Sequence, residues 1–253
     1  MEARHSRASV VSMAAIAVCL ATTLHEGVGH GVTAWLRGDV VTQLTSNHLS
    51  SVRPDRLVDA GGTLANLVVG FASMMISVAS GKRANQRYFF WIFGALNLLS
   101  GAGYFLFSGA LGVGDWDQVI AGSPHYVGFR VLMVIFGAVW YVAILRLIAM
   151  EIHPFLTRRR DYNRLARLAY CAACATDCVA GAFDPMGVKL LLISTIPAVF
   201  GGFSGLLWAD VFLPKFSVER PLIVKPSRAL WVAAIVIVAL FVGVLGRGVE
   251  FRH

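Results

Sequence analysis

The residues with the clearest potential for chemistry are two histidines and a glutamate, His25, Glu26 and His30. They lie in the stretch Leu-His-Glu-Gly-Val-Gly-His-Gly at residues 24–31. Imidazole nitrogens and carboxylate oxygens are common ligands of Zn²⁺ in proteins. The stretch is part of an apolar segment, where ionisable groups are costly and generally face a cavity, a metal or one another. These three side chains are therefore the first candidates for a functional site.

Their spacing differs by one residue from the His-Glu-x-x-His signature of zinc peptidases, because three residues separate Glu26 from His30. On an ideal α-helix, residues i and i+5 lie about 140° apart, so His25 and His30 would not share a metal. One π-bulge, with its i→i+5 hydrogen bond, would bring both imidazoles to a common face. Gly27 and Gly29 favour such a distortion, since glycine relaxes the limits on backbone angles.

A structural interpretation of the same residues stays open. Glu26 and His30 stand at i and i+4, where a buried hydrogen-bonded pair would fix the packing of the helix. His25 would then be capped by a neighbouring group. In that case the three polar side chains would serve packing and not catalysis.

The elements that position these residues are membrane-spanning helices. Of the 253 residues, 57% are hydrophobic and 14% are charged, whereas soluble domains are about 45–50% apolar and about 25% charged. The apolar residues form blocks of roughly 20, the length that crosses a bilayer. We expect an all-α transmembrane helix bundle in a lipid bilayer, with about seven spans near residues 10–36, 58–80, 88–112, 127–150, 164–182, 187–210 and 228–246.

The segment 164–182 is the weakest of these spans, because it carries Arg164, Arg167 and Asp177. It could instead be a short or interfacial segment. The chain would then have six spans, and every loop after this segment would lie on the opposite side of the membrane. The sequence contains no internal repeat and no low-complexity linker. Residues 1–253 are therefore expected to form a single integral membrane domain.

The chain is basic, with 22 Lys and Arg against 14 Asp and Glu and a formal charge of +8. In a soluble protein this excess could indicate binding to nucleic acid, but basic residues also collect in the cytoplasmic loops of membrane proteins. We therefore expect no nucleic acid partner. With seven spans, Lys and Arg concentrate on the side of the N-terminus, which predicts a cytoplasmic N-terminus in a bacterial-type inner membrane.

The motif resembles two families. The spacing is similar to the extended His-Glu-x-x-x-His signature of dipeptidyl peptidase III, and its place in a first transmembrane helix resembles the site-2 protease family of intramembrane zinc metalloproteases. Further matches to that family are residues 62–66, Gly-Thr-Leu-Ala-Asn, and residues 97–100, Asn-Leu-Leu-Ser. Residues 114–116, Gly-Asp-Trp, stand where a Leu-Asp-Gly motif is expected. The family's prolines are absent, and its Asp lies closer to the Asn than it does here.

The site-2 protease resemblance covers residues 20–120 and implies a metalloprotease-like core at 10–125, followed by additional transmembrane helices at 126–253. It implies Zn²⁺ as the cofactor, bound by His25, His30 and Asp115, with Asp117 as a competing third ligand. Glu26 would be the general base, and Asn66 or Asn97 would donate a hydrogen bond to the developing oxyanion. The substrate would be a membrane protein or peptide.

Other interpretations remain open at this stage. Asn66 and Asn97 could be interhelical hydrogen-bond donors, and Asp115 and Asp117 could be solvated loop carboxylates. The whole protein could be a non-catalytic metal-binding or transport protein, or a partner-binding membrane protein with an inactive motif. Orientation is also open, since site-2 proteases commonly hold zinc near the cytoplasmic face, whereas the charge distribution puts this site toward the outside.

Overall fold

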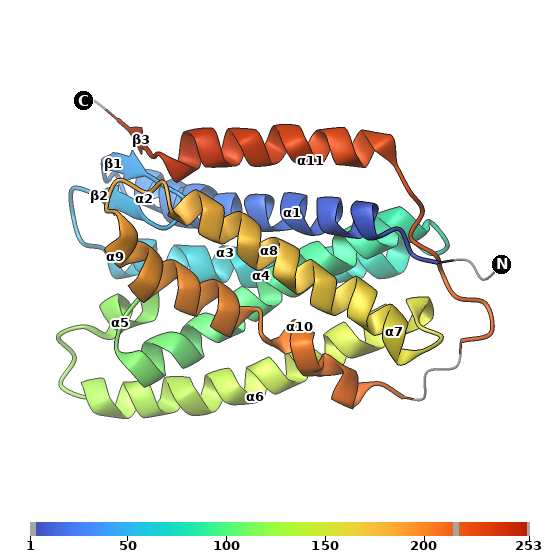
Figure 1. Cartoon of the computed structure of the whole chain (residues 1–253). Helices are drawn as coiled ribbons and strands as arrows, with labels where there is room; N and C mark the ends of the chain where they lie inside the picture. The colour runs from blue at the N-terminus through green and yellow to red at the C-terminus, as the bar shows by residue number, and fades with distance from the viewer. Residues whose placement is uncertain (1–3, 215–217, 252–253) are drawn as a thin grey trace.

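The computed structural model describes residues 4–214 and 218–251, and it is an all-α helical bundle (Figure 1). Within the described residues, six helices are long and apolar enough to span a membrane. The bundle class and the membrane setting predicted from the sequence are thus confirmed. The six spans are α1 (Arg7–Thr23) with η1 (Leu24–Val32) and α2 (Thr33–Leu36); α3 (Arg56–Ala79); α4 (Ala84–Leu111); α6 (Tyr126–Ile152) with η2 (His153–Phe155); α9 (Val188–Leu190) through η4 (Leu191–Thr195), η5 (Pro197–Gly201), α10 (Gly205–Trp208) and η6 (Ala209–Phe212); and α11 (Arg228–Leu240) with η7 (Phe241–Gly246).

The weak segment 164–182 is not among these six. It forms most of η3 (Asn163–Arg167) and all of α8 (Leu168–Gly181), which continue the short helix α7 (Arg159–Tyr162), and α8 packs beside α1. In space it still runs the length of the bundle, so the two chain ends lie at opposite ends of the molecule (Figure 1). One of the two arginines at its start is paired, since Arg167 donates to Leu207 O and to Asp210.

The N-terminus lies at one end of the bundle, which is called the N-terminal side below (Figure 1). One hydrophobic cluster, built from α1, α4, α6, α8 and η6, fills this side. Its few polar atoms are satisfied by backbone carbonyls. Trp91 donates its indole N–H to Ile148 O, Tyr88 donates to Leu165 O, and Tyr162 donates to Leu206 O. Burial of these aromatic side chains with their polar atoms hydrogen-bonded stabilises this half.

The opposite end, here the hairpin side, carries a small sheet that the sequence did not predict. Strands β1 (Val41–Leu44) and β2 (Leu49–Ser51) form an antiparallel hairpin, and β3 (Val249–Glu250) pairs with β1 to give the order β2-β1-β3. The short helix α5 (Asp115–Ile120) lies at the same end (Figure 1). The hairpin and α5 enclose the end of the first span that holds His25 and His30.

Candidate metal centre

The first span changes its hydrogen bonding where the candidate residues begin. After α1, the nine residues Leu24–Val32 form a π-helix, η1. The π-distortion predicted from the five-residue spacing is therefore present. It brings the imidazole rings of His25 and His30 together, with ring centroids 4.8 Å apart and planes at 84°. Both side chains are buried, with 4% and 6% of their surface exposed.

Asp115, the first residue of α5, meets both imidazoles. Its Oδ2 lies 3.1 Å from Nε2 of His25 and 3.5 Å from Nε2 of His30. The preceding turn needs glycine, because Gly112 and Gly114 have φ values of 67° and 84°. Burial alone would raise the pKa of the Asp115 carboxyl, but hydrogen bonds with the two histidines outweigh it and hold that pKa below its usual range.

Asp117, the competing carboxylate, is engaged elsewhere. Its Oδ1 accepts a hydrogen bond of 2.5 Å from the Tyr126 hydroxyl. Asp115 and Asp117 stand at i and i+2 on one short helix, so their side chains diverge. Of the two acidic residues that the sequence left open as third ligand, only Asp115 contacts the histidines.

Backbone contact between η1 and α3 makes the cluster compact. A Cβ atom at Gly62 would lie 2.5 Å from Nε2 of His30 and 2.6 Å from Nε2 of His25. At the same crossing a Cβ at Gly29 would lie 2.5 Å from the Cα of Gly62. Only glycine fits at both positions, because real Cβ contacts do not come so close. Gly62 therefore provides the space into which both Nε2 atoms point.

Neighbouring groups fix the two rings. The Nδ1 atom of His30 lies 2.6 Å from the carbonyl oxygen of Val58, which can only accept, so Nδ1 donates this hydrogen bond and Nε2 is the nitrogen that faces Asp115. The ring of His25 stacks on Tyr104 of α4, with centroids 4.8 Å apart and planes at 20°. A backbone carbonyl on the second ring nitrogen, as at His30, orients histidine ligands in metal sites, whereas Nδ1 of His25 is buried without a partner among the described residues.

The donor set fits zinc. Ligand atoms about 2.0–2.1 Å from a tetrahedral zinc lie about 3.3 Å from one another, and the 3.1 and 3.5 Å separations to Asp115 bracket that value. One ligand atom each from His25, Glu26 and His30 also lies within 4.8 Å of the others. Three protein ligands with an adjacent carboxylate are typical of catalytic zinc sites, in which a fourth position is kept open.

No protein-family model, curated protein or solved structure matches the chain. The site's own geometry is therefore the basis for assigning a function.

Glu26 lies between two polar cavities. It lines an outer cavity of about 260 Å³ with His30, Asp115 and His48 of the hairpin turn. It also lines an inner cavity of about 50 Å³ with His25 and Asn66. Glu26 is 4% exposed, and its Oε2 has no hydrogen-bond partner within residues 4–214 and 218–251. A buried carboxylate oxygen needs a partner, and the inner cavity has room for water molecules.

The two predicted asparagines differ in position. Asn66 lines the inner cavity, and its Oδ1 is buried without a partner among the described residues. Asn97 is fully buried and donates from Nδ2 to Phe93 O, one turn earlier on α4. It lines neither polar cavity, whereas Ser100 of the same helix does. The structure thus brings Asn66, but not Asn97, to the cavity that Glu26 lines.

Several residues of the site were not expected from the sequence. Tyr104 supports His25, and Asp177 of α8 lines the inner cavity and accepts a hydrogen bond from Thr22. Asn47, in the hairpin turn, lines both polar cavities, donates to Asp184 and accepts from Thr195. Only Asp177 carried a signal, as a carboxylate within an apolar segment.

Proposed function

We propose that the protein is an intramembrane zinc metalloprotease that hydrolyses peptide bonds of membrane-associated polypeptides. One observation carries the proposal. The Oδ2 of Asp115 lies 3.1 and 3.5 Å from the Nε2 atoms of His25 and His30, separations that suit tetrahedral zinc, over a glycine and next to the carboxylate of Glu26. Of these groups, His25, Glu26 and His30 lie within a segment that is apolar enough to span a membrane.

Each polar group then has a role. His25, His30 and Asp115 would hold the zinc ion, which would act as a Lewis acid that polarises a carbonyl and makes water more acidic. Glu26 accepts a proton from the attacking water, whose oxygen forms the new bond to the carbonyl carbon. When the C–N bond breaks, Glu26 returns that proton to the leaving amine. The Asn66 amide, in the same inner cavity, donates a hydrogen bond to the developing oxyanion.

The surroundings of the site support hydrolysis of an apolar substrate. The outer polar cavity, lined by charged residues such as Arg53, Asp55 and Asp59, gives water a route to Glu26. The rest of the described bundle presents many exposed apolar side chains, as expected for a surface that faces lipid. A site reached by water from one side, within a bundle whose outer surface is apolar, suits peptide bonds within or beside a membrane.

The decisive experiment compares Glu26→Gln with wild type in detergent micelles, using model transmembrane peptides as substrates and measuring zinc per chain in parallel. Cleavage should fall by about 10²–10⁴-fold, while zinc content stays unchanged. The matched control is Glu250→Gln on the exposed strand β3, which should leave both unchanged. Peptide cleavage by Glu26→Gln at the wild-type rate would contradict the proposed role.

The same experiment separates the protease from a metal-binding or transport protein. A transporter needs polar groups at successive depths, whereas the N-terminal side of this bundle is filled by the large hydrophobic cluster. Zinc bound by wild type without cleavage of any peptide in the panel, together with zinc uptake into vesicles that contain the protein, would favour transport.

The orientation that we propose puts the N-terminal side in the cytoplasm of a bacterial-type inner membrane, because basic residues concentrate there. Single cysteines at Lys82 and His125, in loops on the N-terminal side and the hairpin side respectively, test it in a background that lacks the native cysteines. In intact cells, an impermeant thiol reagent should label the cysteine at position 125 and not the one at position 82. The reverse pattern would invert the orientation.

A further inference from the structure

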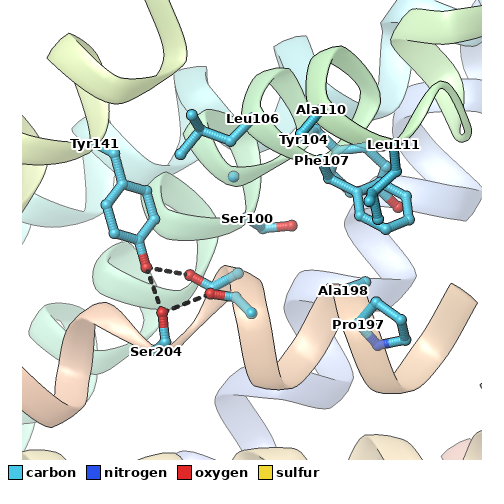
Figure 2. Close-up of a pocket in the computed structure, with 13 residues that line it drawn as sticks. Ser100, Tyr104, Leu106, Phe107, Ala110, Leu111, Tyr141, Pro197, Ala198 and Ser204 are labelled. Atoms are coloured by element: carbon cyan, nitrogen blue, oxygen red, sulfur yellow. Dashed lines mark hydrogen bonds between the residues drawn. The ribbon is translucent and has the colours of Figure 1, made fainter. Parts of the chain in front are cut away.

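Beside the metal centre lies an apolar cavity of about 450 Å³ between α4, α6 and η5 (Figure 2). This is within the range of about 300–1,000 Å³ that is typical of small-ligand sites. Its walls come mainly from Leu106 and Phe107 of α4 and from Pro197 and Ala198 of η5. At its rim Leu111 is 60% exposed, so the cavity lies close to the apolar outer surface.

The cavity adjoins the candidate metal centre. Ser100, Tyr104 and Ala198 line both this apolar cavity and the inner polar cavity that contains His25 and Glu26. Tyr104 also stacks on His25. A group bound in the apolar cavity would therefore be separated from the candidate zinc ligands by little more than the Tyr104 ring.

Polar atoms are distributed unevenly over the walls. At the end away from the metal centre, the Tyr141 hydroxyl lies 2.7 Å from Gly202 O and 3.3 Å from Ser204 Oγ, and Ser204 donates to Gly201 O (Figure 2). These groups satisfy one another, so a polar ligand there would lose its hydrogen bonds to water with little in return. The end shared with the metal centre has the Ser100 and Tyr104 hydroxyls instead.

We propose that this cavity, named here the side-chain pocket, binds a large apolar side chain of the substrate next to the peptide bond that is cleaved. The inference rests on the proposed protease function. The polar end suits the peptide backbone near Glu26, and the apolar end suits a side chain of the size of Leu or Phe. Specificity for such residues follows from the volume of the pocket.

Two glycines that line the pocket have room for a side chain, so a substitution there can test the pocket. A Cβ atom at Gly201 or Gly202 would meet no atom within 4 Å, so a larger side chain at Gly202 can extend into open space. Gly202→Leu should partly fill the side-chain pocket. Gly243 of η7 also has open space at its Cβ position and does not line the pocket, so Gly243→Leu is the matched control.

The experiment uses model transmembrane peptides with Leu, Phe or Ala at each position around the bond that wild type cleaves. Wild type should prefer Leu or Phe over Ala at one position by roughly 10-fold or more, since about 10–200-fold is typical for one methylene in a hydrophobic pocket. Gly202→Leu should lose or reverse this preference at unchanged zinc content, and Gly243→Leu should retain it. Equal preferences in wild type and Gly202→Leu would overturn the pocket assignment.

A second readout does not depend on cleavage. A transmembrane peptide with photoactivatable leucine should crosslink to pocket residues such as Phe107 and Ala198 in the Glu26→Gln protein, and the Gly202→Leu substitution should abolish this crosslink. Crosslinks confined to other surfaces would overturn the pocket even if peptides are cleaved. A phospholipid that copurifies with wild type but not with Gly202→Leu would assign the pocket to lipid. Crosslinks in the pocket without cleavage by wild type would instead count against the protease function alone.

Discussion

The first span is one continuous helix with two halves, α1 and η1. The halves differ in their backbone hydrogen bonding and in the side chains that they present. The α1 half is a regular α-helix of small and apolar residues that packs against α4, α8 and α11. The η1 half is a π-helix that contacts α3 through glycine and presents His25, Glu26 and His30 on one side.

The difference shows what the extra residue between Glu26 and His30 does. In a regular α-helix it would turn the imidazoles away from each other. In η1 the i→i+5 hydrogen bonds absorb that residue, and the flanking segments α1 and α2 continue the same helix. The first half thus provides stability, and the second half accepts an irregular backbone in order to form a site.

A large loss of zinc affinity is expected from filling the space beneath the imidazoles. Gly62→Ala puts a methyl group 2.5–2.6 Å from both Nε2 atoms, so zinc affinity should fall by roughly 100-fold or more, the upper range for perturbing a ligand's surroundings. Zinc per chain after dialysis against a weak chelator measures it. Gly128→Ala, where a Cβ meets nothing within 4 Å, is the control that should bind as wild type does.

The next test changes the register within η1. Inserting one alanine after Val28 adds a second extra residue, which should separate the imidazoles and remove zinc binding. Deleting Val28, which is 49% exposed, should convert η1 to α-helix with His-Glu-x-x-His spacing and retain zinc. The zinc content of both purified variants tests these two predictions. Loss of zinc in a folded deletion variant would mean that the π-helix is required in itself.

A smaller effect is expected at Tyr104, which stacks on His25. Tyr104→Leu should weaken zinc binding by roughly 10-fold, the low end for losing an orienting neighbour, whereas Tyr104→Phe keeps the ring and should bind as wild type does. Competition with a chromogenic chelator gives both affinities. If Tyr104→Leu binds zinc as tightly as wild type, the stacking does not orient His25.

The smallest effect is expected from removing either of two equivalent threonine hydroxyls, one bonded to each half of the first span. Thr23 Oγ1 donates to Cys19 O at the end of α1, and Thr33 Oγ1 donates to Gly29 O of η1, both at 2.7 Å. Each Thr→Val substitution should lower the free energy of unfolding by about 0.5–1.5 kcal/mol. Only Thr33→Val should also weaken zinc binding, by a few-fold. Equal zinc affinities in the two variants would remove the functional contrast between the halves.

Much of the architecture could be predicted because bilayer thickness fixes the length of an apolar helix. The six apolar spans begin and end within a few residues of the predicted segments, and 164–182 differs because Arg164 and Arg167 begin it. The π-helix was also predictable, since the His25 to His30 spacing and two glycines demand it if the rings are to meet.

The remainder depends on contacts between segments far apart in the chain, which no local pattern reports. The hairpin at 41–51 is local, but its position against the bundle depends on the hydrogen bond from Asn47 to Asp184, residues that are 137 apart. The choice of Asp115 over Asp117 depends on the turn at Gly112 and Gly114, and the position of Tyr104 depends on the packing of α4. Asn97 matched the resemblance in sequence but lies outside the polar cavities.

We propose that His25, His30 and Asp115 bind zinc. The most direct test of this proposal is the zinc content of protein purified in detergent, for wild type, His25→Ala and the matched control His125→Ala, whose residue lies in an exposed loop. We predict about one zinc per chain in wild type and in His125→Ala, and none in His25→Ala. Well-folded wild type without bound metal, or zinc that remains in His25→Ala, would contradict the account.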